Sequence, residues 1–210
     1  MSGGLADLTN YIRELDQDRV LEAVDKHLAE GAKPLEIVEA LQKGMTEVGE
    51  AFAKGEVFLS ELIMCGEIMK QVMEKLEPLL VGQEQEYKGT IVLGTVKGDI
   101  HDLGKNIVAM LLKGAGYRVV DLGVDVPEQK FIDALKETKA PLVGMSVLLT
   151  ACQDAMKDTI KAIRDAGLTD VKVLIGGNYV DEKVKEYCGA DYFGTSADVA
   201  VRVANEVFGA

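Results

Sequence analysis

The sequence predicts a four-helix bundle followed by a Rossmann-like, flavodoxin-like α/β domain with a five-stranded parallel sheet. Apolar residues recur at spacings of three and four from Leu5 to about Leu80, which is typical of helices. After the polar stretch VGQEQEYKG, residues 81–89, short β-branched runs alternate with amphipathic segments. We interpret that stretch as a linker, and expect a bundle domain at residues 1–87 and an α/β domain at residues 88–210.

Helix-breaking and helix-starting residues divide the first domain into four expected helices. Asp16 is a candidate N-cap for one helix, and Gly31 followed by Pro34 ends that helix and starts the next. Gly55 ends the third helix before Phe58 opens the fourth. The short connections favour antiparallel neighbouring helices, as in an up-down bundle.

Five strands are expected in the second domain, each followed by a helical segment. They are TIVLGT from Thr90, YRVVDLG from Tyr117, PLVGMSV from Pro141, VKVLIGG from Val171 and ADYFG from Ala190. Repeated βα units imply a parallel sheet with helices on both faces. Right-handed crossovers place the second strand on one side of the first and the third on the other. We therefore expect a ligand crevice beyond the carboxyl ends of these strands.

Composition excludes several classes of function. The chain has 35 acidic and 23 basic residues and a net charge of −12, so we expect neither nucleic acid nor membrane as a partner. It has no apolar run of the roughly 20 residues that span a bilayer and no signal-peptide pattern, which predicts a cytoplasmic protein. Its three cysteines are widely spaced without a CxxC pair, which argues against a disulfide framework or a thiolate zinc site.

The loop after the first expected strand carries a candidate metal ligand. It reads GTVKGDIHDLGKN and places Asp99, His101 and Gly104 as D-x-H-x-x-G before a helix that opens near Asp102. A histidine at a loop tip suits metal ligation when a nearby acid holds its other ring nitrogen. Aspartates also cap helix starts, so the loop alone leaves that role open. The other histidine, His27, is expected on a helix surface near the helix's C-terminal end.

This loop resembles the cobalamin-binding motif of methionine synthase and of the corrinoid proteins of methyltransferase systems. The segments DLGVDVP from Asp121, SVLLT from Ser146 and IGG from Ile175 are similar to the rest of that motif, in the same order. The segment from Gly55 to Leu80 is similar to the last helix of the family's N-terminal helical cap. The resemblance therefore covers nearly the whole chain.

The resemblance implies cobalamin or another corrinoid as the cofactor. It makes His101 the lower ligand of the cobalt, with Asp99 bound to its imidazole, and sends the displaced nucleotide tail of the cofactor into a slot beside the sheet. The cofactor-binding residues that it implies are Gly98, Asp99, Ile100, His101, Asp102 and Gly104 in the first loop, Ser146, Leu148 and Thr150 in the third, Gly176 and Gly177 in the fourth, and Phe58 in the cap.

The sequence departs from methionine synthase at one position of this motif. Cys152 stands two residues beyond Thr150, where methionine synthase has a serine that continues the proton relay from the acid-linked histidine. A thiol is a weaker hydrogen-bond donor than a hydroxyl. We therefore expect an altered proton path, with ligation by His101 unaffected.

The function that the resemblance implies is methyl transport on cobalt. The chain would be the methyl-carrier subunit between a donor-specific methyltransferase and an acceptor methyltransferase acting on tetrahydrofolate or a thiol, served by a reductive activator protein. Two alternatives remain. A cobalamin-dependent sensor would be expected to carry a DNA-binding or effector segment. The cobalamin subunit of an adenosylcobalamin mutase would not be expected to carry a helical cap of this type. The sequence does not identify the methyl donor.

Overall fold

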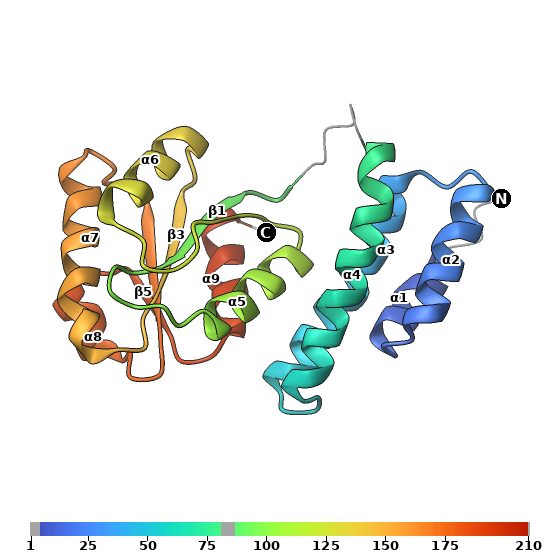
Figure 1. Ribbon diagram of the computed structural model, residues 1–210, viewed down its shortest axis with the longest axis horizontal. Helices are drawn as coiled ribbons and strands as arrows, with labels where there is room; N and C mark the ends of the chain where they lie inside the picture. The colour runs from blue at the N-terminus through green and yellow to red at the C-terminus, as the bar shows by residue number, and fades with distance from the viewer. Residues whose placement is uncertain (1–4, 81–86, 210) are drawn as a thin grey trace. The chain divides into compact units, whose positions relative to one another are not determined.

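The computed structural model describes residues 5–80 and 87–209, which belong to two compact units (Figure 1). The first unit is helical, and the second contains a parallel sheet with its helices. Residues 81–86 of the expected linker lie outside the described residues. No helix in the described part of the chain is long and apolar enough to cross a membrane.

The helical unit contains four helices among the residues described, as predicted. They are α1 (Ala6–Arg13), α2 (Gln17–Ala29), α3 (Pro34–Ala53) and α4 (Leu59–Leu80). Asp16 caps α2 by accepting a hydrogen bond from the Arg19 N–H, and Pro34 is the first residue of α3. Helix α1 packs on α2 and α3, and α4 packs on the same two helices. The enclosed core includes Leu8, Ile12, Val24, Ile37, Leu41, Leu62 and Ile68.

The expectation of a surface position for His27 is wrong. Its side chain is 9% exposed, and its Nε2 lies 2.9 Å from both carboxylate oxygens of Asp7. Glu30 approaches the other ring nitrogen at 3.7 Å. Asp7 lies on α1, so a different helix supplies the hydrogen-bond partner with which this histidine can be buried inside the bundle.

The second unit is a five-stranded parallel sheet in the order β2-β1-β3-β4-β5, which confirms the predicted fold. The strands are β1 (Thr90–Thr95), β2 (Arg118–Asp121), β3 (Leu142–Ser146), β4 (Lys172–Gly176) and β5 (Tyr192–Gly194). The helices are α5 (Leu103–Gly114), α6 (Glu128–Thr138), α7 (Gln153–Asp165), α8 (Glu182–Cys188) and α9 (Asp198–Phe208), with a short 3-10 turn η1 (Thr150–Cys152) before α7.

Helices cover both faces of the sheet, with α6, α7 and α8 on one face and α5 and α9 on the other (Figure 1). The larger core lies under α6 and α7, where Phe131, Met156 and Ile160 pack against Val92, Val143 and Val173 of the central strands. These strands are apolar at nearly every position because both faces are buried.

The carboxyl ends of four strands align in one row. Thr95 is paired with Ser146, Ser146 with Gly176, and Gly176 with Gly194. The loops that follow β1, β3 and β4 therefore begin at the same edge of the sheet. This is the edge at which the sequence predicts a ligand crevice.

Candidate functional site

In the loop after β1, one ring nitrogen of His101 is hydrogen-bonded to the carboxylate of Asp99. Nδ1 of His101 lies 2.6 Å from Oδ1 of Asp99. The Asp99 carboxylate is fully buried, whereas 48% of the His101 side chain is exposed. An ionised carboxylate only accepts hydrogen bonds, so Nδ1 is the protonated nitrogen. In the neutral imidazole, Nε2 then carries the lone pair that can bind a ligand.

Hydrogen bonds keep the Asp99 carboxylate ionised despite its burial. Burial alone would raise the pKa, but Asp99 accepts bonds from the backbone N–H groups of His101 at 3.0 Å, Leu148 at 2.5 Å and Leu149 at 2.9 Å, and from the His101 ring. Together these donors hold the pKa of Asp99 at about 2. The same carboxylate ties the loop after β1 to the loop after β3.

Both ends of the histidine loop are anchored as well. The Thr95 hydroxyl, at the end of β1, donates a hydrogen bond to the His101 carbonyl at 3.0 Å. Asp102 accepts hydrogen bonds from both the backbone and the side-chain amide of Asn106. Asp102 is therefore placed at the start of α5, where it stabilises the first turn.

Apolar side chains stand exposed around His101. Ile100 is 72% exposed and Leu148 is 41% exposed, and both were expected in the site. Sequence reasoning missed three others, Leu103 at 59%, Leu149 at 41% and Val124 at 37% exposed. One feature of the sequence could have identified all five: each is an apolar residue in a segment that follows a strand, and exposed segments of this kind are usually polar. Such a cluster of exposed apolar groups marks a binding surface.

The structure gives a different explanation for each glycine of the motif. Gly98 has φ +85°, and a Cβ there would lie 3.2 Å from Sγ of Cys152. A Cβ on Gly177 would lie 1.8 Å from the Val147 carbonyl oxygen, so close packing inside the protein already requires that glycine. A Cβ on Gly104 would meet nothing within 4 Å, and one on Gly176 would make an ordinary contact. Open space is therefore found beside Gly104.

The remaining expected residues are Ser146 and Thr150 in the sheet unit and Phe58 in the helical unit. Ser146 is half-buried at the end of β3, next to Gly176, whereas Thr150 is exposed in η1. Phe58 belongs to the helical unit, where it precedes α4 directly, and is 79% exposed. A residue this exposed contributes little to the packing of its own unit.

Cys152 lies beside the Asp99–His101 pair as a buried, neutral thiol. Burial raises its pKa, and the negative charges of Asp99 and Asp125 raise it further. Tyr179, in the loop after β4, was not predicted. Its hydroxyl donates to the Leu149 carbonyl at 3.2 Å, and burial raises its pKa to about 12. The loops after β3 and β4 are thus connected.

The donor set around His101 suits a metal that is already chelated. Within residues 5–80 and 87–209, no group of three or more histidine, cysteine, aspartate or glutamate side chains could hold a metal ion. A bare ion needs several protein ligands. One available imidazole nitrogen surrounded by apolar side chains instead fits a metal whose other positions are filled by a flat organic ring.

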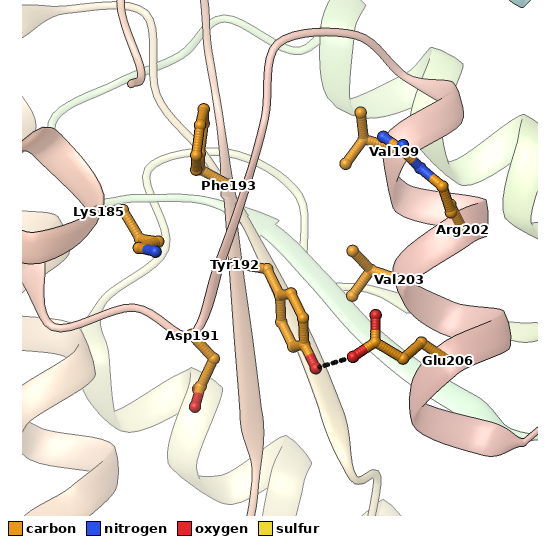
Figure 2. A pocket seen from close by; sticks show the side chains of 8 residues that line it. All are labelled: Lys185, Asp191, Tyr192, Phe193, Val199, Arg202, Val203 and Glu206. Carbon is orange, nitrogen blue, oxygen red and sulfur yellow. Dashed lines mark hydrogen bonds between the residues drawn. The ribbon is translucent and has the colours of Figure 1, made fainter. Parts of the chain in front are cut away.

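A separate cavity of about 300 Å³ lies between α8, β5 and α9 (Figure 2). Tyr192 and Glu206 meet across it through a hydrogen bond of 2.9 Å. None of the residues predicted for the site lines this cavity. The lining residues are Lys185, Asp191, Tyr192, Phe193, Val199, Arg202, Val203 and Glu206.

Both units match known protein families. Residues 89–204 match a family described as B12 binding domain, and residues 5–77 match a second family with the same description. Dimethylamine corrinoid protein 3 of Methanosarcina acetivorans is 37% identical over 209 residues, covering 99% of this chain and 98% of that protein. A corrinoid protein of Desulfitobacterium hafniense is 39% identical over 210 residues, covering 98% and 97%.

Two solved structures are also similar. A cobalamin-binding protein from Desulfitobacterium hafniense is 40% identical with a TM-score of 0.75, covering 96% of this chain and 97% of that one. The methanol:cobalamin methyltransferase complex MtaBC from Methanosarcina barkeri contains a chain that is 28% identical with a TM-score of 0.90. The match covers all of this chain and 81% of that one.

Proposed function

The chain belongs to the corrinoid protein family with B12 binding domains, as its sequence motif predicted, and we propose that it is a methyl-carrier protein in which His101 is the lower ligand of the cobalt. The corrinoid supplies a cobalt centre that accepts and releases a methyl group. The protein supplies the imidazole, its orientation and the surface that receives the ring.

The observation that carries this proposal is the Asp99–His101 pair. Nδ1 of His101 is hydrogen-bonded to a buried, ionised carboxylate, so Nε2 is the ring nitrogen that remains for a ligand, and the ring plane is set before any ligand arrives. Ligating histidines in proteins usually have their second nitrogen held in this way, which fixes the tautomer and raises the basicity of the ligand. We therefore assign Asp99 the role of orienting and tuning His101.

The surroundings of His101 fit the flat face and the tail of a corrinoid. Ile100, Leu148 and the other exposed apolar residues would contact the ring and exclude water from the histidine. The open space beside Gly104 and the half-buried row of Ser146, Gly176 and Gly194 offer a place for the nucleotide tail. Asp102 and Thr150 would lie at the margin of this surface, whereas Gly98 and Gly177 would shape its loops.

The helical unit is proposed as a cap for the other face of the corrinoid. Phe58 supports this role because the residue is 79% exposed although its side chain is large and apolar. A hydrophobic ring of this kind can shield a reactive group from water once a cofactor is bound. On this proposal residues 1–87 are the cap domain and residues 88–210 bind the cofactor.

The known proteins that this chain resembles support a role together with partner methyltransferases. One of them is a chain of a methanol:cobalamin methyltransferase complex, and another is a dimethylamine corrinoid protein. We propose that this chain works with a donor-specific methyltransferase, an acceptor methyltransferase that uses tetrahydrofolate or a thiol, and a reductive activator, all in the cytoplasm.

Replacing the ligand tests the proposal. Wild type and His101→Ala are loaded with cobalamin, and the visible spectrum of the oxidised cobalt is compared with that of imidazole-ligated cobalamin. Wild type should show the imidazole spectrum and His101→Ala should not, although the tail slot should still retain cofactor. His27→Gln, which alters the other histidine, is the control and should resemble wild type. An unchanged spectrum and methylation rate in His101→Ala would refute ligation by this residue.

A further inference from the structure

We propose that Asp125 is a positioning residue that holds the backbone before His101 and so sets the direction from which His101 reaches the cobalt. This inference rests on the proposed function. It gives the loop after β2, which also carries the exposed Val124, a role in positioning His101.

Asp125 holds the Gly98–Asp99 segment at both of its ends. Its Oδ1 accepts a hydrogen bond from the Gly98 N–H at 2.7 Å, and its own N–H donates to the Asp99 carbonyl at 2.9 Å. The first of these bonds is charge-assisted, because its acceptor is a carboxylate. The two residues immediately before the Ile100–His101 tip are therefore fixed by a single side chain and its backbone.

The backbone around this clamp is constrained. Asp125 adopts φ +51°, in the left-handed region that aspartate tolerates better than most residues, and Gly98 has φ +85°. The next residue, Val126, forms a parallel bridge with Val96 and donates its N–H to the Thr95 carbonyl at 3.0 Å. Asp125 is thus carried by a segment that is fastened to the end of β1.

The clamp and the Asp99 carboxylate restrain the loop from two directions. Leu148 and Leu149 hold the side chain of Asp99, whereas Asp125 holds its carbonyl. Without the Asp125 carboxylate, Gly98 would lose its hydrogen-bond partner and glycine's wide conformational range would be available to it. Asp99 and His101 would then spend less time in the ligating arrangement.

The test uses substitutions that separate the hydrogen bond from the backbone conformation. Asp125→Gly allows the positive φ and removes the acceptor, whereas Asp125→Asn allows it and keeps an amide oxygen as acceptor. Asp16→Gly is the matched control, because Asp16 also accepts a backbone N–H, in the helical unit. Each full-length protein is loaded with cobinamide, a corrinoid that lacks the nucleotide base, so an imidazole-type spectrum can come only from the protein.

The ratio of ligated to unligated cobinamide should fall on the order of tenfold in Asp125→Gly, the effect of one charge-assisted hydrogen bond. It should largely recover in Asp125→Asn and stay at the wild-type value in Asp16→Gly. In the protein without cofactor, the Gly98 amide hydrogen should exchange about tenfold faster in Asp125→Gly. This second readout also applies if the variant binds corrinoid poorly.

The outcomes separate this inference from the proposed function. A wild-type protein that gives no imidazole-type spectrum overturns the proposed function, and the positioning role falls with it. A ligated wild type with an equal ratio in Asp125→Gly overturns the positioning role alone, as does unchanged Gly98 exchange. A loss in Asp125→Asn as large as in Asp125→Gly would also refute the clamp, because that variant keeps the acceptor.

Discussion

Replacing Asp99 by asparagine should destabilise the sheet unit even before any cofactor binds. Asp99 accepts bonds from three backbone N–H groups and from the His101 ring, and its carboxylate is fully buried. Asparagine retains one oxygen but turns an NH₂ group towards some of these donors. A buried donor left without a partner costs about 1–3 kcal/mol. The loops after β1 and β3 should therefore separate more easily in Asp99→Asn.

The pKa of Asp99 gives the size and the pH dependence of the stability that its carboxylate contributes. Folding lowers this pKa from 3.8 to about 2. At about 1.4 kcal/mol per pKa unit, ionised Asp99 contributes about 2 kcal/mol to the stability of the wild type. A lowered pKa stabilises the folded state above the unfolded value of 3.8, and the contribution is lost as pH falls towards about 2. By about pH 3, roughly half of it should remain.

The measurement is urea denaturation of wild type and Asp99→Asn without cofactor, at several pH values between about 3 and 7, the range of the predicted change. Amide signals of the sheet unit in NMR spectra would report its unfolding separately from that of the helical unit. The wild type should be more stable by about 2 kcal/mol at neutral pH, and this advantage should shrink as the pH falls. Equal stabilities at neutral pH, or a difference independent of pH, would refute the role given to the carboxylate.

Three further predictions concern other parts of the chain. Residues 88–210 alone should bind cobalamin, because the sheet has its own core, but should lose the methyl group to light faster than the full chain; equal rates would contradict the cap assignment. Gly104→Ala should raise the stability of the cofactor-free protein by up to about 1 kcal/mol, because alanine has the higher helix propensity. The same change should weaken binding of cobalamin but not of cobinamide, which paired binding titrations check; equal losses for both would rule out a tail slot there. Lys105, whose side chain is 3% exposed, pairs with Asp121 at 2.5 Å. Asp121→Ala should therefore cost up to about 3 kcal/mol in urea denaturation, the lower end for a buried pair, because Asn106 still accepts a hydrogen bond from Lys105. Lys105→Met should cost about 1 kcal/mol or less, because it leaves no buried charge unpaired; equal costs would contradict this.

Local sequence patterns predicted the fold and part of the site. The β-branched runs located all five strands to within two residues at their starts, since strands buried on both faces must be continuously apolar. The resemblance to the cobalamin-binding motif implied the side-chain pair of Asp99 and His101, and the structure has this pair because the contact forms within one loop. The handedness of βα units predicted that β2 and β3 lie on opposite sides of β1, as they do.

Contacts between distant segments could not be predicted. Asp125 reaches Gly98 from 27 residues away, and Leu148 reaches Asp99 from 49 residues away. His27 is buried because Asp7 of another helix meets it. Each of these contacts depends on how two elements pack, which no single stretch of sequence encodes.

Isotope labelling of the protein offers the most direct test of cobalt ligation. The protein is produced with ¹⁵N, loaded with unlabelled cobalamin and reduced to Co(II), and its EPR spectrum is recorded. A ligating protein nitrogen splits the cobalt lines into doublets, whereas the cofactor's own ¹⁴N base splits them into triplets. We predict doublets in the wild type and their absence in His101→Ala. Triplets in the wild type, or doublets that persist in His101→Ala, would contradict the assignment of His101 as the lower ligand.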